Sequence, residues 1–312
     1  MIRMMPPQPH VSWSAPSLSY PDGVAAERRR ALDAYVELAK PRIVLMVLMT
    51  AAAGFLVGSP GGLELLALLV WLVGIASAAA GAGALNMLLE RAPDALMART
   101  RTRPLPEGRV EPRRALAFGA AAAASGVAVL SVLSSPAAGI ATAVCLTLYL
   151  FVYTPLKRVS AWCIVPGAIA GAMPPLIGCT AAAGAIHRRA LALFAIQFLW
   201  QLPHVVALGW LYREDYARAG LRMLPAGARA GLKTSLVAAG AALLLMPVSI
   251  LPMRAGLAGP VYGCGAAVLG AAYASAALRF GVRPGRGSAK GLFLASIAYL
   301  PSLLLFLAAG RF

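Results

Sequence analysis

The sequence predicts an all-α protein that is embedded in a membrane. Hydrophobic residues make up 60% of its 312 residues and charged residues only 12%, whereas soluble domains average about 25% charged residues. Apolar segments of about 20 residues recur along the whole chain, and a helix of that length crosses a hydrocarbon core of about 30 Å. These observations together indicate a polytopic membrane protein with one helical domain.

The apolar runs and the residues that interrupt them define nine spans. Each run is bounded by Pro, Gly or charged residues, which mark the ends of helices. The expected spans are residues 43–58, 65–89, 115–133, 137–153, 162–183, 190–211, 234–252, 257–278 and 291–309.

The distribution of Lys and Arg predicts the orientation of these spans. With the N-terminus in the cytoplasm, all but four of the 28 basic residues lie on the cytoplasmic side, the exceptions being Arg188, Arg189, Arg254 and Arg311. Such an asymmetry is typical of multi-pass membrane proteins, and nine spans then place the C-terminus outside. The same asymmetry explains most of the net charge of +17, so nucleic-acid binding is not needed to account for it.

Residues 1–30 are expected to form a disordered tail, and residues 31–312 the membrane domain. The first part of the tail is rich in Pro and Ser and lacks the apolar segment of a cleaved signal peptide. The four cysteines lie in apolar stretches without metal-ligand spacing, so neither a disulfide framework nor a zinc site is expected.

The first candidate site lies at the end of the second span, in the segment from Asn86 to Asp94. On a helix, Asn86, Glu90 and Asp94 fall within an arc of roughly 80° and therefore face one way. Oxygen ligands of this kind suit Mg²⁺, which usually takes one or two carboxylates and completes its shell with water and phosphate oxygens. Pro93 should bend or end the helix near Glu90, because it cannot donate to the carbonyl of Leu89.

A second acidic segment, containing Asp215, lies on the connection between the sixth and seventh spans. The sequences from Asp94, "DALMARTRTRPLPEGR", and from Asp215, "DYARAGLRMLPAGAR", resemble each other weakly. The likeness implies two related halves that face each other across a central cavity, each supplying one polar cluster.

Basic residues near these acids are candidates for binding a diphosphate. Guanidinium groups bind phosphate oxygens in a bidentate manner, and charge that builds on a departing diphosphate would be stabilised by such groups and by Mg²⁺. The alternative is that they are ordinary cytoplasmic cations, and that the acids form a salt-bridged helix end. The candidates are Arg99, Arg101, Arg103, Lys157 and Arg158.

His204 is the one histidine inside an expected span, in "LPHVVALGW". An ionisable residue within a membrane is a functional candidate by default, and a contact with a heme iron or propionate is one interpretation. A structural histidine, hydrogen-bonded to its surroundings, is the other.

Several motifs resemble those of the UbiA-type intramembrane prenyltransferases. These are "NMLLERAPDALMARTRTRPLP" from Asn86, "YTPLKR" from Tyr153 and "GAIAGAMPPLIGCTAAAG" from Gly167, together with "WQLPHVVALGWLYREDYARAGLRMLP" from Trp200. The likeness covers roughly residues 30–310 and is strongest to the branch that farnesylates heme.

This resemblance implies nine transmembrane helices around a central cavity in the bacterial inner membrane. It also implies Mg²⁺-dependent transfer of farnesyl from farnesyl diphosphate to a vinyl group of heme B, with heme A synthase as a possible downstream partner. By the same resemblance, Asn86, Glu90 and Asp94 would form the first diphosphate–Mg²⁺ motif, and Asp215 would be a metal ligand of the second. One departure is Leu211, because many relatives have an acid four residues before the position of Asp215. Two other functions stay open on the sequence, namely prenyl transfer to an aromatic quinone precursor and, remotely, transport.

Overall fold

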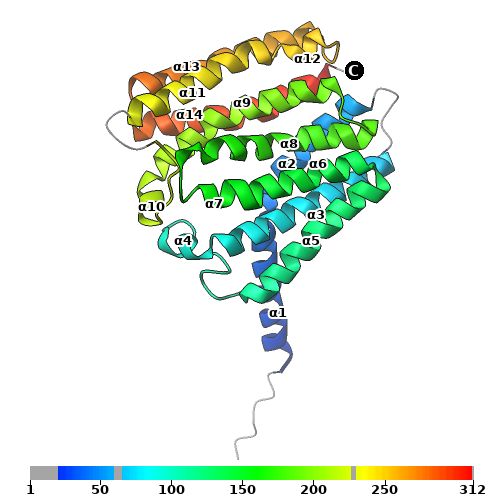
Figure 1. The fold of residues 1–312 in the computed structure, drawn as a ribbon, viewed down its shortest axis with the longest axis vertical. Helices are drawn as coiled ribbons and strands as arrows, with labels where there is room; N and C mark the ends of the chain where they lie inside the picture. Colours follow the sequence, from blue (N-terminus) through cyan, green and yellow to red (C-terminus); the bar gives the residue numbers. More distant parts are fainter. Residues whose placement is uncertain (1–19, 60–64, 226–229, 311–312) are drawn as a thin grey trace, which may run out of the picture.

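The structure is a computed structural model, and it describes residues 20–59, 65–225 and 230–310. Within these ranges all regular elements are helical (Figure 1). The first 19 residues of the predicted tail lie outside the described part. The remaining tail residues belong to helix α1, Tyr20–Ala39, so the boundary expected at residue 30 does not coincide with the end of an element.

Nine helices in the described part of the chain are long and apolar enough to cross a membrane. Their ends lie within a few residues of the expected limits, so the predictions of an all-α fold and nine spans are confirmed. The spans are α2 (Pro41–Gly58), α3 (Leu65–Leu89), α5 (Pro112–Leu133), α6 (Pro136–Thr147) continued by η1 (Leu148–Tyr153) and α7 (Thr154–Leu156), η2 (Ala161–Cys163) with α8 (Ile164–Ala183), α9 (Arg188–Leu211), α11 (Ala230–Val248) with α12 (Leu251–Arg254), α13 (Pro260–Val282) and α14 (Arg286–Ala309).

Proline begins several of these helices, because its fixed φ suits the first turn and its missing N–H has no partner there anyway. Helices α2, α5, α6 and α13 all start in this way. Before α6, the Ser135 hydroxyl also accepts a hydrogen bond from the backbone N–H of Ala138 at 3.2 Å. These local signals explain why the helix starts could be read from the sequence.

Lys40 separates α1 from α2 and has a left-handed backbone conformation, with φ 52° and ψ 59°. It is the only non-glycine residue with positive φ in the described ranges. Such a conformation is costly for a residue with a Cβ and tends to mark a functional position. Here it turns the chain from α1 into the first membrane span.

Small residues let two pairs of helices pack closely. A Cβ added at Gly54 of α2 would lie 1.9 Å from the carbonyl oxygen of Pro175 in α8. A Cβ at Gly81 of α3 would lie 2.4 Å from the backbone nitrogen of Ala123 in α5. Membrane helices associate through such backbone approaches because no hydrophobic driving force acts between them in lipid.

Two short helices, α4 (Arg91–Leu96) and α10 (Arg213–Arg218), lie at the same end of the bundle (Figure 1). Each follows one residue after a long helix, α3 or α9 respectively. The segments that carry them meet, because Met97 packs in one cluster with Leu221 and Met223. This arrangement matches the sequence likeness between the two acidic segments.

Candidate active site

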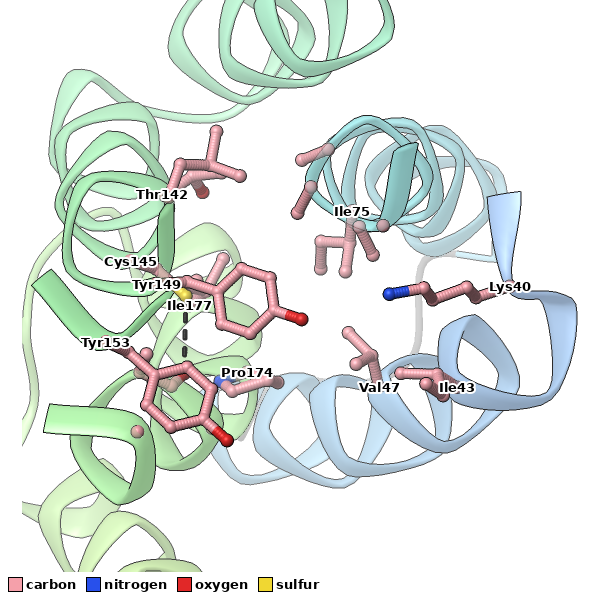
Figure 2. A pocket seen from close by; sticks show the side chains of 18 of the residues that line it. Lys40, Ile43, Val47, Ile75, Thr142, Cys145, Tyr149, Tyr153, Pro174 and Ile177 are labelled. Carbon is pink, nitrogen blue, oxygen red and sulfur yellow. Dashed lines mark hydrogen bonds between the residues drawn. The ribbon is translucent and has the colours of Figure 1, made fainter. Parts of the chain in front are cut away.

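A largely apolar cavity of about 260 Å³ lies between α2, α3, α6, η1, α8 and α9. Small side chains of the segments 77–85 and 167–175 form much of its wall, including Ala78, Ala82 and Gly171. Figure 2 shows the Lys40 ammonium group pointing into this cavity from one side and the Tyr149 hydroxyl from the other. The cavity therefore has a largely apolar lining with a few polar groups.

A π-helix, η1 (Leu148–Tyr153), forms one wall of the cavity. Such wide turns are rare and often occur at functional sites. The rings of Tyr149 and Tyr153 lie 5.7 Å apart, and both line the cavity. The hydroxyl of Thr154 donates to the carbonyl of Tyr149 at 2.8 Å and so fixes the end of the turn.

Asn86 connects the cavity to the end of the bundle. Its side chain is buried, and its Oδ1 accepts a hydrogen bond from Lys40 Nζ at 2.7 Å. Its Nδ2 donates to Thr154 Oγ1 at 3.2 Å. Asn86 therefore joins α2, α3 and the end of η1 beside the cavity.

Glu90 lies one turn further on and forms an ion pair with Lys157. Their Oε1 and Nζ atoms are 2.9 Å apart, and both side chains are buried. The ammonium group of Lys157 also lies 4.2 Å from the centroid of the Tyr153 ring. Burial alone would lower the pKa of Lys157, but its interactions with Tyr153 and Glu90 outweigh burial and raise that pKa above its ordinary value.

Asp94 is almost completely buried, at 1% exposure, and pairs with Arg103 through Oδ2 and Nη1 at 2.6 Å. The Thr100 hydroxyl donates to its carbonyl oxygen at 2.8 Å and holds the following loop. Its second carboxylate oxygen, Oδ1, is buried and has no hydrogen-bond partner among the described residues. A buried carboxylate oxygen without a partner is costly, and binding a cation would relieve that cost.

The expected effect of Pro93 is confirmed, because α3 ends at Leu89 and α4 begins at Arg91. The carbonyl of Leu89 accepts a hydrogen bond from Arg158 Nη2 at 3.1 Å instead. Arg158, which the sequence predicts to bind diphosphate, is exposed and uses one nitrogen for this contact. The contact gives Arg158 a structural role in joining two segments.

The remaining predicted residues lie at the same end of the bundle but are more exposed. Asp215 is half-buried and pairs with Arg218. Arg99 is exposed over the Tyr212 ring, 4.9 Å from its centroid, and Arg101 is exposed without an ion pair in the described ranges. In this structure Asp215 therefore pairs within its own helix, and it forms no hydrogen bond with Asn86, Glu90 or Asp94.

The residues present fit a hydrated Mg²⁺ ion better than a site made by protein ligands alone. The described residues contain no group of three His, Cys, Asp or Glu side chains that could hold a metal. Mg²⁺ does not require such a group, since it commonly takes one or two carboxylates and several water or phosphate oxygens. The unpaired Oδ1 of Asp94 and the Glu90 carboxylate would be the oxygen ligands that come from the protein.

Lys40 is the residue that the sequence interpretation missed, since it was counted only among the cytoplasmic cations. The loss of water around its ammonium group, together with the positive charges of Arg103 and Lys157, lowers the pKa of Lys40 to about 7, although Glu90 and Asp94 act in the opposite direction. The cluster thus holds three basic side chains against two carboxylates. An excess of positive charge in a buried place is suited to binding a polyanion.

His204 lies in α9 and faces α14. Its Nδ1 is 2.7 Å from the hydroxyl of Ser296, which in turn donates to the carbonyl of Phe293 at 2.5 Å. Its ring also packs on Trp200 and Phe293, with centroids 5.0 and 5.2 Å apart. His204 is not among the residues that line the cavity, so its contacts favour the structural interpretation.

The cavity, the carboxylates and the basic cluster define a membrane-embedded site for a long apolar group with an anionic head. A family model described as the UbiA prenyltransferase family matches residues 47–305. The chain belongs to this family of intramembrane prenyltransferases.

Two curated relatives that share one name match most of this chain. Protoheme IX farnesyltransferase of Solibacter usitatus is 41% identical over 277 residues, covering 86% of this chain and 94% of the relative. The protein of the same name from Salinibacter ruber is 42% identical over 271 residues, covering 86% and 95%.

Solved structures share the fold. A digeranylgeranylglyceryl phosphate synthase structure superposes with a TM-score of 0.76 at 18% identity, covering 90% of this chain and 98% of that one. A UbiA homolog from Archaeoglobus fulgidus, bound to GPP and Mg²⁺, superposes with a TM-score of 0.63 at 16% identity, covering 88% of this chain and 99% of that one. At these identities the likeness supports the UbiA fold.

Proposed function

We propose that the protein transfers the farnesyl group of farnesyl diphosphate to a vinyl group of heme B, which yields heme O and diphosphate. The identity of about 40% to protoheme IX farnesyltransferases, over most of both chains, supports this choice of substrates. The observation that carries the proposal in this structure is a cluster of charged side chains beside an apolar cavity, in which Glu90, Asp94 and Lys157 are buried and Lys40 and Arg103 are half-buried.

The basic side chains of the cluster bind the diphosphate and stabilise the charge that develops on it as the allylic C–O bond breaks. Lys40 reaches into the cavity, and in this proposal it contacts the diphosphate oxygen nearest the prenyl chain. The apolar wall keeps water away from the allylic carbon, because water would otherwise capture the cation that forms there. The vinyl group then attacks that carbon through its terminal CH₂. The cation left on the carbon next to the porphyrin ring takes up a water molecule, which loses a proton and becomes the hydroxyl group of heme O.

Mg²⁺ would neutralise part of the diphosphate charge and make it a better leaving group. Asp94 and Glu90 are the residues proposed to hold the ion, with the amide oxygen of Asn86 as a further ligand. Each of these oxygen-bearing side chains is paired with a basic side chain in this structure. Asp215 would complete the site from the opposing segment, and Arg99 and Arg101 from the loop after Asp94.

Three further parts of the proposal concern the surroundings of the site. The concentration of Lys and Arg on the loops of one side supports a cytoplasmic N-terminus and an external C-terminus, in a bacterial inner membrane. Transfer of the product to heme A synthase is a separate prediction that rests on the sequence alone. A contact between His204 and heme also rests on the sequence alone, and the contacts of His204 with Ser296, Trp200 and Phe293 favour the structural interpretation instead.

The test is an assay with purified protein, Mg²⁺, labelled farnesyl diphosphate and either heme B or 4-hydroxybenzoate. Labelled heme O is expected only with heme B, and omission of Mg²⁺ should abolish it. Product formed only with the aromatic acid would refute the proposed acceptor. Movement of the diphosphate across a vesicle membrane without any covalent product would instead support the transport alternative.

A further inference from the structure

A second hollow lies on the outside of the bundle, where α3, α4 and α5 meet the segment after α7. It has a volume of about 520 Å³ and shares no lining residue with the cavity. Three basic and three apolar side chains form most of this groove, namely Arg91, Arg113, Arg158, Leu88, Leu89 and Leu116.

The charge in this groove is not compensated. No acidic side chain lines it. Arg91 and Arg113 are exposed and make no ion pair in the described part of the chain, while Arg158 uses one nitrogen to donate to the carbonyl of Leu89. Three guanidinium groups from separate segments therefore converge on one opening without an anion of the protein.

The apolar part of the groove continues along the membrane spans. Leu89 is 45% and Leu116 is 51% exposed, and these residues lie at the last turn of α3 and the second turn of α5. Exposed leucines at the end of a span face the outer part of the hydrocarbon layer. The arginines lie just beyond them, at the level expected for lipid headgroups on the side that carries most of the basic residues.

We propose that this groove binds an anionic phospholipid, with its phosphate between Arg91, Arg113 and Arg158 and an acyl chain along Leu89 and Leu116. Basic pockets between membrane helices on the cytoplasmic side bind anionic headgroups. A free phosphate ion would use the arginines but not the leucines. The diphosphate substrate is bound elsewhere in the proposed function, because the Glu90–Lys157 pair is buried inside the bundle.

The groove is coupled to the candidate active site through adjacent residues. Glu90 and Lys157 pair inside the bundle, while their successors Arg91 and Arg158 line the groove outside. A lipid phosphate that binds both arginines would hold the same two segments together from outside. The bound lipid is therefore expected to stabilise the Glu90–Lys157 pair.

The experiment measures binding of phosphatidylglycerol to the full-length purified protein by native mass spectrometry, with phosphatidylcholine as the neutral comparison. The variant Arg91→Gln/Arg113→Gln removes two charges that no described contact uses. The matched control, Arg283→Gln/Arg286→Gln, removes two exposed charges from the start of α14 and the residues before it. Arg113→Gln alone serves as a milder variant if the double variant is poorly folded.

We expect one phosphatidylglycerol to be retained by the wild type and by the control. Its affinity should fall roughly 10- to 30-fold in the double variant, since each arginine near an anionic membrane surface contributes about 1 kcal/mol. An equal loss in both double variants would refute a local site, and so would equal retention of phosphatidylcholine. Displacement of the lipid by millimolar inorganic phosphate would also overturn the proposal, since it would assign the groove to a free anion. None of these results depends on prenyl transfer.

Discussion

Replacing Lys40 with Met is expected to stabilise the free protein while weakening substrate binding. The pKa of Lys40 falls from 10.5 to about 7 in the folded protein, and a shift of this size corresponds to roughly 5 kcal/mol against folding when the group is charged in both states. Met has a similar length and no charge. Its introduction removes this cost but leaves Asn86 Oδ1 without its partner, which costs about 1–3 kcal/mol.

The effect of Lys40→Met on the free energy of unfolding depends on pH. Below pH 7 the lysine is protonated in both the folded and the unfolded chain, so the full cost is present. Between pH 7 and 10.5 the folded chain carries the neutral form, and the cost falls as the pH rises. We therefore expect Lys40→Met to raise the free energy of unfolding by about 2 kcal/mol at pH 6 and to lower it by about 1 kcal/mol at pH 9, a change of about 3 kcal/mol.

The assays are denaturant unfolding in one detergent at pH 6 and pH 9, and steady-state kinetics with farnesyl diphosphate. Loss of one hydrogen bond to a charged group should raise KM for the diphosphate roughly 10- to 100-fold. Lys290→Met, at an exposed position of α14, is the matched control and should change neither quantity. An unchanged KM, together with a stability difference that is the same at both pH values, would refute the assignment of Lys40.

Three further predictions test the carboxylates, the helix packing and the histidine. Asp94→Asn should lower kcat at least about 100-fold in the labelled-farnesyl assay while the protein still inserts, because it removes the charge that Oδ1 offers to a cation; a normal rate at the same Mg²⁺ concentration would contradict this role. Gly54→Ala should lower stability by about 1–3 kcal/mol in denaturant unfolding, whereas Gly240→Ala, which has open space around it, should not lower it. His204→Gln should leave the absorption spectrum of bound heme B unchanged, and a shifted Soret band would instead assign His204 to the iron.

The sequence alone was enough to predict what depends on local spacing. Runs of apolar residues and the residues that interrupt them predicted the nine spans, and the four-residue spacing placed Asn86 and Glu90 on one face. Pro93 correctly predicted a break at Leu89, because the loss of a backbone hydrogen bond is a local property. These features need no knowledge of the rest of the chain.

Partners that come from distant segments could not be predicted in the same way. Nothing near Asn86 in the sequence indicates that Lys40, 46 residues away, donates to it. The partner of the Leu89 carbonyl is 69 residues away, and it proved to be one of the arginines assigned to the diphosphate. Asp215 matched its motif, yet its carboxylate pairs with Arg218 within the same short helix. Which cation meets which anion is decided by helix packing.

The wide turn of η1 also sets the rotational phase of everything that follows it. Each residue of a regular helix advances the direction of the next side chain by 100°. If the same six residues formed regular α-helical turns, the span would still be long enough to cross the bilayer, but Lys157 would be rotated by roughly 100° relative to Glu90 and the cavity wall. The span would survive such a change, and the alignment of its lining with its charged end would not.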